Sequence, residues 1–226
     1  MQKESQSLQL RVQGPMACFT RPEMKAERVS YAVITPSAAR GVLEAVFWKP
    51  AIVWRIDQIR VLNPIQWISF RRNEVKNRAV APAAAIIDGG GTVPMQLIED
   101  DRAQRNTVAL RDVDYVIEAH FELTERAGPE ETVKKFEEMF KRRVDKGQHF
   151  HQPYLGCREF IADILPVDGD TPTPISDSRD LGLMLWDMSF SENGNRPRFF
   201  HAQMQNGVVA VPADPESTLK LKGGKS

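Results

Sequence analysis

Apolar and polar residues alternate in two stretches of the chain. Leu8, Leu10 and Val12 alternate with polar residues, and Gly14–Pro15 is expected to end this first strand. Residues 112–123 show the same period and place five apolar side chains on one face: Val113, Tyr115, Ile117, Ala119 and Phe121. Because successive side chains of a strand point to opposite faces, both stretches are predicted to be half-buried strands.

Two other stretches have the apolar spacing of helices. Thr35–Pro36 is typical of a helix start, and the apolar positions that follow predict a helix that stops before Pro50. The second predicted helix gathers its apolar residues on one face, ends before Gly147 and carries basic residues on the opposite face. The apolar residues of this face are Val133, Phe136, Met139, Phe140 and Val144.

The connecting segments are less regular. Residues 51–70 are rich in Val, Ile and Trp, which predicts either one long bent strand or a hairpin around Asn63–Pro64. Residues 71–105 contain an Ala/Pro tract, Gly89–Gly90–Gly91 and an acidic patch, and are read as an excursion from the core. Near the end of the chain three short strands are expected, with Asn206–Gly207 as a hairpin turn.

This order of elements predicts an α+β fold. Residues 1–165 are expected to form a ferredoxin-like (RRM-like) domain with both helices on one face of an antiparallel sheet and an inserted excursion at about 71–105. Residues 166–226 are expected to form a smaller β-rich part that ends in a polar tail.

Composition narrows the possible functions. The chain has 226 residues, 42% of them hydrophobic, and its 30 basic and 30 acidic residues cancel, so binding to a nucleic acid must come from local clusters. Cys18 and Cys157 are far apart and lack CxxC spacing, which argues against a zinc ribbon or a disulfide framework and fits a reducing cytosol. No signal peptide or membrane span is expected, and the predicted location is cytoplasmic.

Three local clusters of basic residues stand out. The second helix has six basic and three acidic residues from Lys134 to Lys146, and the others lie in RPEMKAER and RRNEVKNR. Such groups contact RNA phosphates, although each cluster taken alone could be a solvated surface. The residues expected to bind RNA are Arg21, Lys25, Arg28, Arg71, Arg72, Lys141, Arg142 and Arg158.

His149, His151 and Lys135 are the candidate catalytic residues. RNA can be cut without a metal when a base takes the 2′-OH proton, a cation stabilises the phosphorane and an acid protonates the 5′ oxygen. The two histidines flank Phe150 in a segment that follows the basic helix, although histidines in such positions can also serve packing alone. No metal ligand set and no cofactor are expected, and the three glycines lack the lysine of a phosphate-binding loop.

Several blocks of the sequence resemble a known family. Residues 18–31, 36–50, RRNEV at Arg71, and residues 112–123 and 147–160 are similar to the subtype I-C form of CRISPR-associated protein five, of the RAMP superfamily. The resemblance implies a metal-independent endoribonuclease that cuts the repeat hairpin of precursor CRISPR RNA to a cyclic phosphate. It also implies that the protein stays on the 5′ handle, together with the other subunits of a type I-C Cascade complex.

The chain departs from the family pattern at two positions. Phe47 stands before Trp-Lys-Pro where relatives carry a tyrosine or histidine, and Lys135–Phe136 stands where they often carry Lys-His. We therefore expect Lys135 to stabilise the phosphorane and His149 or His151 to transfer protons. The alternative is a catalytically weak or inactive subunit that binds the handle. A metabolic enzyme that does not use RNA is a third class, which would need a deep apolar pocket.

Overall fold

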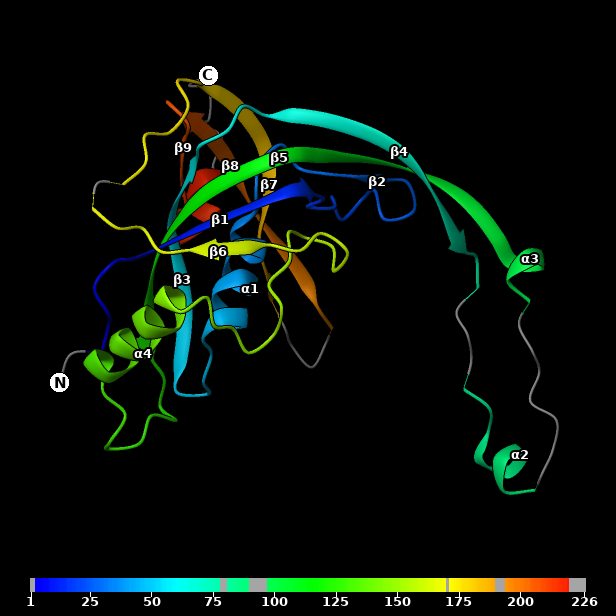
Figure 1. Ribbon diagram of the computed structural model, residues 1–226, viewed down its shortest axis with the longest axis horizontal. Helices are drawn as coiled ribbons and strands as arrows, with labels where there is room; N and C mark the ends of the chain where they lie inside the picture. The colour runs from blue at the N-terminus through cyan, green and yellow to red at the C-terminus, as the bar shows by residue number, and fades with distance from the viewer. Residues whose placement is uncertain (1–2, 78–80, 90–96, 170, 190–193, 220–226) are drawn as a thin grey trace, which may run out of the picture.

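The protein is built around one strongly curved, mostly antiparallel sheet with two helices below it (Figure 1). The computed structural model describes residues 3–77, 81–89, 97–169, 171–189 and 194–219. The described strands follow the order β6-β1-β5-β3-β9-β8-β7, and β2 and β4 also pair with β5. The α+β class expected from the sequence is therefore confirmed.

Strand β1 (Leu8–Ala17) lies between β5 (Arg102–Leu123) and β6 (Asp163–Leu165) and is antiparallel to both. The prediction that Gly14–Pro15 ends this strand is wrong, because pairing continues to Ala17. Gly14 has a packing role instead. A Cβ atom at this position would lie 2.6 Å from Leu155 Cδ1 and 2.9 Å from Ile161 O, so glycine allows a later loop to cross the strand closely.

Strand β5 pairs with two strands in succession along one edge. β3 (Ile52–Val61) pairs with its second half, and β4 (Gln66–Val75) pairs with its first half. The chain turns between them beside Asp112, which has a φ of 51°, and Leu62 N donates to Asp114 O there. Both interpretations of residues 51–70 are wrong, because this stretch forms two separate strands, broken at residues 62–65, that each pair with β5 and not with each other.

The segment expected to be an excursion, residues 71–105, begins in β4 and ends in β5, and these two strands pair with each other. Residues 71–75 of β4 pair with residues 102–106 of β5, and β2 (Arg28–Val29) runs parallel to β5 on its other edge. Two short helices, α2 (Ala84–Asp88) and α3 (Ile98–Asp101), follow β4 and precede β5 in the sequence, beyond the end of the paired strands (Figure 1). Gly90 and Gly91 of the predicted turn lie outside the described residues.

Both predicted helices are present, with the expected start at Thr35–Pro36 and the expected stop at Gly147. Helix α1 (Pro36–Val46) begins after Thr35, whose hydroxyl accepts a hydrogen bond from Ala38 N. Helix α4 (Val133–Asp145) begins after Thr132 in the same way, and Gly147 follows its end with a φ of 60°. The apolar faces of both helices contribute to the core.

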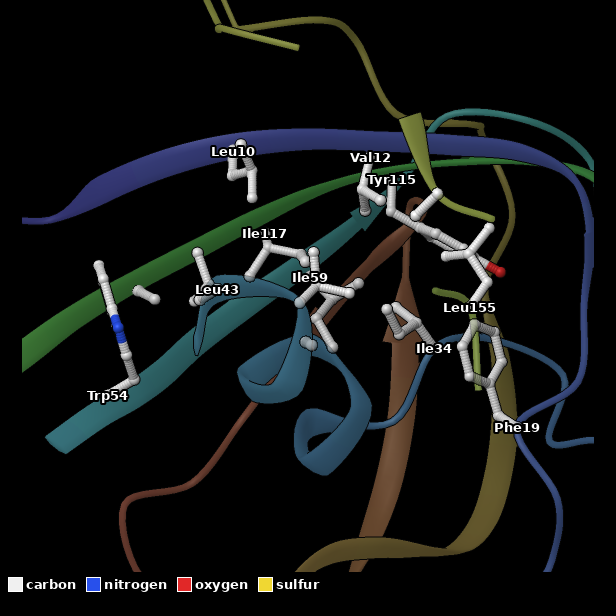
Figure 2. Packing of buried hydrophobic residues seen from close by; sticks show 14 of the residues in the cluster. Leu10, Val12, Phe19, Ile34, Leu43, Trp54, Ile59, Tyr115, Ile117 and Leu155 are labelled. Atoms are coloured by element: carbon white, nitrogen blue, oxygen red, sulfur yellow. The ribbon is translucent and has the colours of Figure 1, made fainter. Parts of the chain in front are cut away.

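The core lies between these helices and the sheet. Leu10, Ile117 and Ile59 from neighbouring strands point toward Leu43 of α1 (Figure 2). The Trp54 ring packs 5.4 Å from the Phe121 ring and 5.0 Å from the Phe140 ring. Trp54 Nε1 also donates to Phe47 O at 2.8 Å, so this one side chain joins β3, β5, α4 and the end of α1.

The C-terminal part continues the same sheet. β7 (Arg179–Ser189), β8 (Arg196–Gln205) and β9 (Val208–Ala210) are the three expected strands, and β9 pairs with β3. Asn206 and Gly207 both have positive φ, as the predicted hairpin turn requires. A short helix, α5 (Glu216–Leu219), follows. Within the described part of the chain, every helix is too short or too polar to cross a membrane.

Candidate nucleic-acid interface

A groove of about 1040 Å³ lies where the end of α1, the last turn of α4 and the loop after α4 meet. We call residues 147–162 the histidine loop. The groove is lined by Gly41, Glu44, Ala45, Trp48, Lys49, Arg143, Phe150, His151, Gln152, Tyr154 and Arg158. Most of these side chains are aromatic, cationic or able to exchange a proton, which is a composition suited to a charged, planar ligand.

The end of α1 fixes the position of the histidine loop. The backbone N–H groups of Phe150 and His151 both donate to Ala45 O, at 2.8 and 3.3 Å. Arg143 Nη1 of α4 donates to Val46 O at 2.7 Å. These carbonyls at a helix end have no partner within their own helix, so the loop and α4 satisfy them. His151 is thereby held against α1.

Three aromatic side chains of the groove are exposed to solvent. Trp48 is 54% exposed, Phe150 is 75% exposed and Tyr154 is 42% exposed. A group of exposed aromatic side chains on one surface indicates a binding site, and unstacked RNA bases bind on such rings. The Phe150 ring also lies 4.5 Å from the His151 ring in an edge-on arrangement.

The groove has a positive charge. Lys49, Arg143 and Arg158 line it, whereas Glu44 is the one carboxylate among the described lining residues. Arg40 Nη1 holds Glu44 at 2.6 Å, which leaves that carboxylate less able to repel a phosphate. The Arg143 guanidinium also packs 5.2 Å from the centre of the Phe47 ring, and this contact fixes its direction.

The three predicted catalytic residues do not lie together. His151 lines the groove, whereas His149 is exposed on the histidine loop outside the lining. Lys135 lies in the first turn of α4, where its Nζ donates to Glu130 O at 3.3 Å. The helix rises about 1.5 Å per residue, so Lys135 is separated from Arg143 in the last turn by roughly 12 Å along the axis. Their roles stay predictions.

The predicted RNA-binding residues lie in several places. Arg158 lines the groove. Lys141 and Arg142 are exposed on α4, next in sequence to Arg143. Lys25 and Arg71 are exposed outside the groove lining.

Arg21, Arg28 and Arg72 already have partners within the protein. Arg21 packs 4.6 Å from the Tyr31 ring centre. Arg28 and Arg72 form ion pairs with the same two carboxylates, which belong to Glu74 and Glu159. A phosphate would have to displace those carboxylates before it could bind either guanidinium. The contribution of these three residues to RNA binding stays a prediction.

Two departures from the family pattern lie in the core near the groove. Phe47 and Phe136 are both almost fully buried, and their ring centres are 5.8 Å apart. Lys49 Nζ lies 6.0 Å from the centre of the Phe136 ring. These two positions are therefore filled by packed apolar rings, whereas His151 and Tyr154 lie in the groove.

Sequence reasoning missed several groove residues. Trp48, Lys49 and Tyr154 lie in short connecting segments without a helix or strand period, and Arg143 looked like one more charge on a solvated helix face. One signal was available: Trp48, Phe150 and Tyr154 are aromatic residues in otherwise polar or proline-containing loops. Such residues are binding candidates even when their positions in space are unknown.

Comparisons with known proteins identify the family of this chain. A family described as CRISPR-associated protein (Cas_Cas5) matches residues 7–212. A CRISPR pre-crRNA endoribonuclease Cas5d from Mannheimia succiniciproducens is 51% identical, over 91% of this chain and 94% of the relative. A protein of the same name from Thermus thermophilus is 41% identical, over 94% of each chain.

The fold is also shared with a solved structure. A crystal structure described as a CRISPR-associated protein superimposes with a TM-score of 0.69 over 98% of both chains, at 21% identity, which speaks to the fold alone. The sequence matches span nearly the whole chain, including the segments that build the groove. The chain belongs to the Cas5 family of CRISPR-associated proteins, in its subtype I-C (Cas5d) branch.

Proposed function

We propose that this protein is an endoribonuclease that matures CRISPR RNA by cutting the repeat of the precursor. It then remains on the 5′ handle in a type I-C Cascade complex. The observation that carries the proposal is the groove, which combines exposed aromatic rings, three cationic side chains and His151. The two curated relatives, at 51% and 41% identity, are both named as pre-crRNA endoribonucleases.

The groove residues bind RNA through two kinds of contact. Lys49, Arg143 and Arg158 hold phosphates, and the rings of Trp48, Phe150 and Tyr154 stack on bases. Phosphate contacts supply affinity and position, and stacking recognises unpaired bases at the edge of a hairpin. Lys141 and Arg142 extend the positive surface along α4 toward the stem of the repeat.

Cleavage proceeds by transesterification within the RNA. The 2′-OH loses its proton and attacks the adjacent phosphorus, the bond from phosphorus to the 5′ oxygen breaks, and a cyclic 2′,3′-phosphate forms. His151 either accepts the 2′-OH proton or donates a proton to the departing 5′ oxygen, with water in the other role, and Lys49 and Arg143 stabilise the charge of the phosphorane. Lys135 and His149 lie outside the groove and contact RNA that flanks the cut.

The remaining parts of the chain position this groove. Residues 1–165 form a ferredoxin-like RAMP domain, which is supported by the order strand, helix, strand, strand, helix, strand in β1, α1, β3, β5, α4 and β6. Residues 166–226 form the β-rich part. The protein works in the cytoplasm with precursor CRISPR RNA and the other Cascade subunits.

A subunit that binds the handle without cutting is the second candidate. The buried pair of Phe47 and Phe136 favours it, because neither ring can donate or accept a proton at positions where the family resemblance implies polar groups. The two candidates share the same groove and differ only in whether His151 and its neighbours complete a catalytic set.

Incubating the purified protein with its cognate repeat RNA in EDTA separates the two candidates. We expect one discrete product that ends in a cyclic phosphate. A matched RNA with a 2′-deoxy nucleotide at the cut should bind equally well and stay intact, because the attacking hydroxyl is missing. Full-length RNA together with a tight gel shift would instead identify a handle-binding subunit.

A further inference from the structure

The two cysteines of the chain lie in contact although they are 139 residues apart in sequence. Cys18 directly follows β1, and Cys157 belongs to the histidine loop. Both are free thiols in the core. Cys157 Sγ lies 3.6 Å from Cys18 O and donates a hydrogen bond to it.

The backbones that carry these thiols are already close. Cys18 N donates to Leu155 O at 3.0 Å. A Cβ atom at Gly156, which has a φ of 84°, would lie 2.1 Å from Cys18 O. Only glycine permits this approach, and a disulfide requires Cα atoms within about 7 Å of each other. These contacts hold the two backbone segments that carry the thiols against each other, as a disulfide between them requires.

The surroundings favour one thiol as the nucleophile. The hydrogen bond from Cys18 lowers the pKa of Cys157 and raises that of Cys18. Arg28 Nη1 lies 3.4 Å from Cys157 Sγ and also lowers this pKa, whereas burial and the Glu159 carboxylate oppose the shift. A thiolate stabilised beside a second thiol is the arrangement from which thiol–disulfide exchange starts.

Cys157 is close in sequence to two residues that line the groove. Arg158 follows Cys157 and lines the groove, and Tyr154 lies three residues before Cys157 and lines it as well. Leu155 N donates to Phe160 O, and Phe160 N donates to Cys157 O, so this part of the histidine loop is compact. A bond at Cys157 would fix the segment that presents both groove residues.

We propose that Cys18 and Cys157 form a reversible intramolecular disulfide when the protein meets a low-molecular-weight disulfide, so that the histidine loop becomes covalently tied to the end of β1. The Cys157 thiolate attacks one sulfur of the oxidant and releases a thiolate. Cys18 then loses its proton and attacks Cys157 Sγ, which releases the second thiolate. Two protein thiols and one small disulfide thus yield one protein disulfide and two small thiols.

Oxidised glutathione tests this proposal on the full, folded protein without RNA. We expect the intact mass to fall by two hydrogens, a nonreduced peptide map to join the two cysteine peptides, and dithiothreitol to reverse both changes. The midpoint of thermal unfolding should rise by roughly 5 °C or more, because a disulfide that closes a long loop restricts the unfolded chain.

Single substitutions give a matched pair. Cys18→Ser should trap a mixed disulfide with glutathione on Cys157, whereas Cys157→Ser should leave Cys18 unmodified. The proposal is overturned if both thiols of the native wild-type protein stay free, if only intermolecular links form, or if Cys18 in C157S reacts faster than Cys157 in C18S. The wild-type map decides the matter even if a variant fails to fold, and none of these measurements depends on RNA cleavage.

Discussion

The ring of Phe47 packs 5.8 Å from the ring of Phe136, and this contact joins the end of α1 to α4 in the core near the groove. Phe136 also packs 6.3 Å from Phe121 of β5. The backbone carbonyl of Phe47 accepts the Trp54 indole N–H. Both phenylalanines are therefore packed as core residues in this protein, which is why we propose that side chains in the groove transfer the proton.

Phe47 should consequently matter for stability more than for chemistry. Phe47→Ala leaves a cavity against Phe136 and should lower the free energy of unfolding by about 3–5 kcal/mol in urea titrations. Phe47→Leu keeps most of the apolar volume and should retain the cleavage rate within about threefold, since a lost acid or base costs about 10²-fold or more. A larger loss of cleavage in a stable Phe47→Leu protein would assign the ring a direct role.

Arg143 should hold the end of α1 in place. Its guanidinium donates to Val46 O and packs on the Phe47 ring. Arg143→Met leaves that carbonyl without its partner, and we expect a loss of about 1–3 kcal/mol in the free energy of unfolding. Arg143→Lys keeps the charge but loses the planar stacking. Compared with Arg143→Met, it should recover more of the RNA affinity than of the free energy of unfolding. Wild-type stability of Arg143→Met would show that the contact is dispensable.

Trp48 and Arg158 should contribute to RNA binding in different ways. Trp48→Ala removes a stacking surface and should weaken binding of the repeat by roughly 5- to 150-fold, with the salt dependence unchanged. Arg158→Gln removes a phosphate contact and should reduce the slope of log K against log salt by about 0.7. Fluorescence anisotropy over a range of KCl concentrations measures both quantities.

A basic residue outside the groove provides the control for that experiment. Arg126 is exposed in the turn between β5 and α4 and does not line the groove. Arg126→Gln removes the same charge as Arg158→Gln and should leave affinity and salt slope unchanged. Equal effects of the two substitutions would mean that RNA responds to total charge and not to the groove.

Cys157 should react as a thiolate at lower pH than an ordinary cysteine. The hydrogen bond from Cys18 and the nearby Arg28 lower its pKa, so the thiolate fraction, which rises with pH, reaches its maximum earlier. The rate of alkylation by iodoacetamide should therefore level off at a lower pH in the wild-type protein than in Arg28→Met. Coincident pH profiles of the two proteins would remove Arg28 from this role.

Local patterns predicted the elements well. Thr35–Pro36 marks a helix start, Gly147 marks a helix end, and Asn206–Gly207 marks a hairpin turn, because each of these signals acts within a few residues. The prediction at Gly14–Pro15 was wrong because Gly14 is required by the close packing of a loop that lies more than a hundred residues later in the chain. Contacts of that range are not visible in local periodicity.

The site was predicted in part. The segment with His149 and His151 does reach the groove, but Lys135 lies near the start of α4, a separation that the length of the predicted helix already implies. Likewise, the sequence suggests that Arg28 and Arg72 are available to bind phosphate, whereas the fold brings the Glu159 carboxylate into an ion pair with each of them. Charge counting along the chain cannot anticipate partners that tertiary structure supplies.

Single-turnover cleavage of the cognate repeat RNA in EDTA, with His151→Ala and His149→Ala compared at saturating protein, tests the central claim most directly. Because His151 lines the groove and His149 does not, the first substitution should slow cleavage at least roughly tenfold while RNA affinity stays near that of the wild type. The second should change the rate by less than about threefold. Wild-type cleavage by the His151→Ala protein would contradict the assignment of chemistry to this groove.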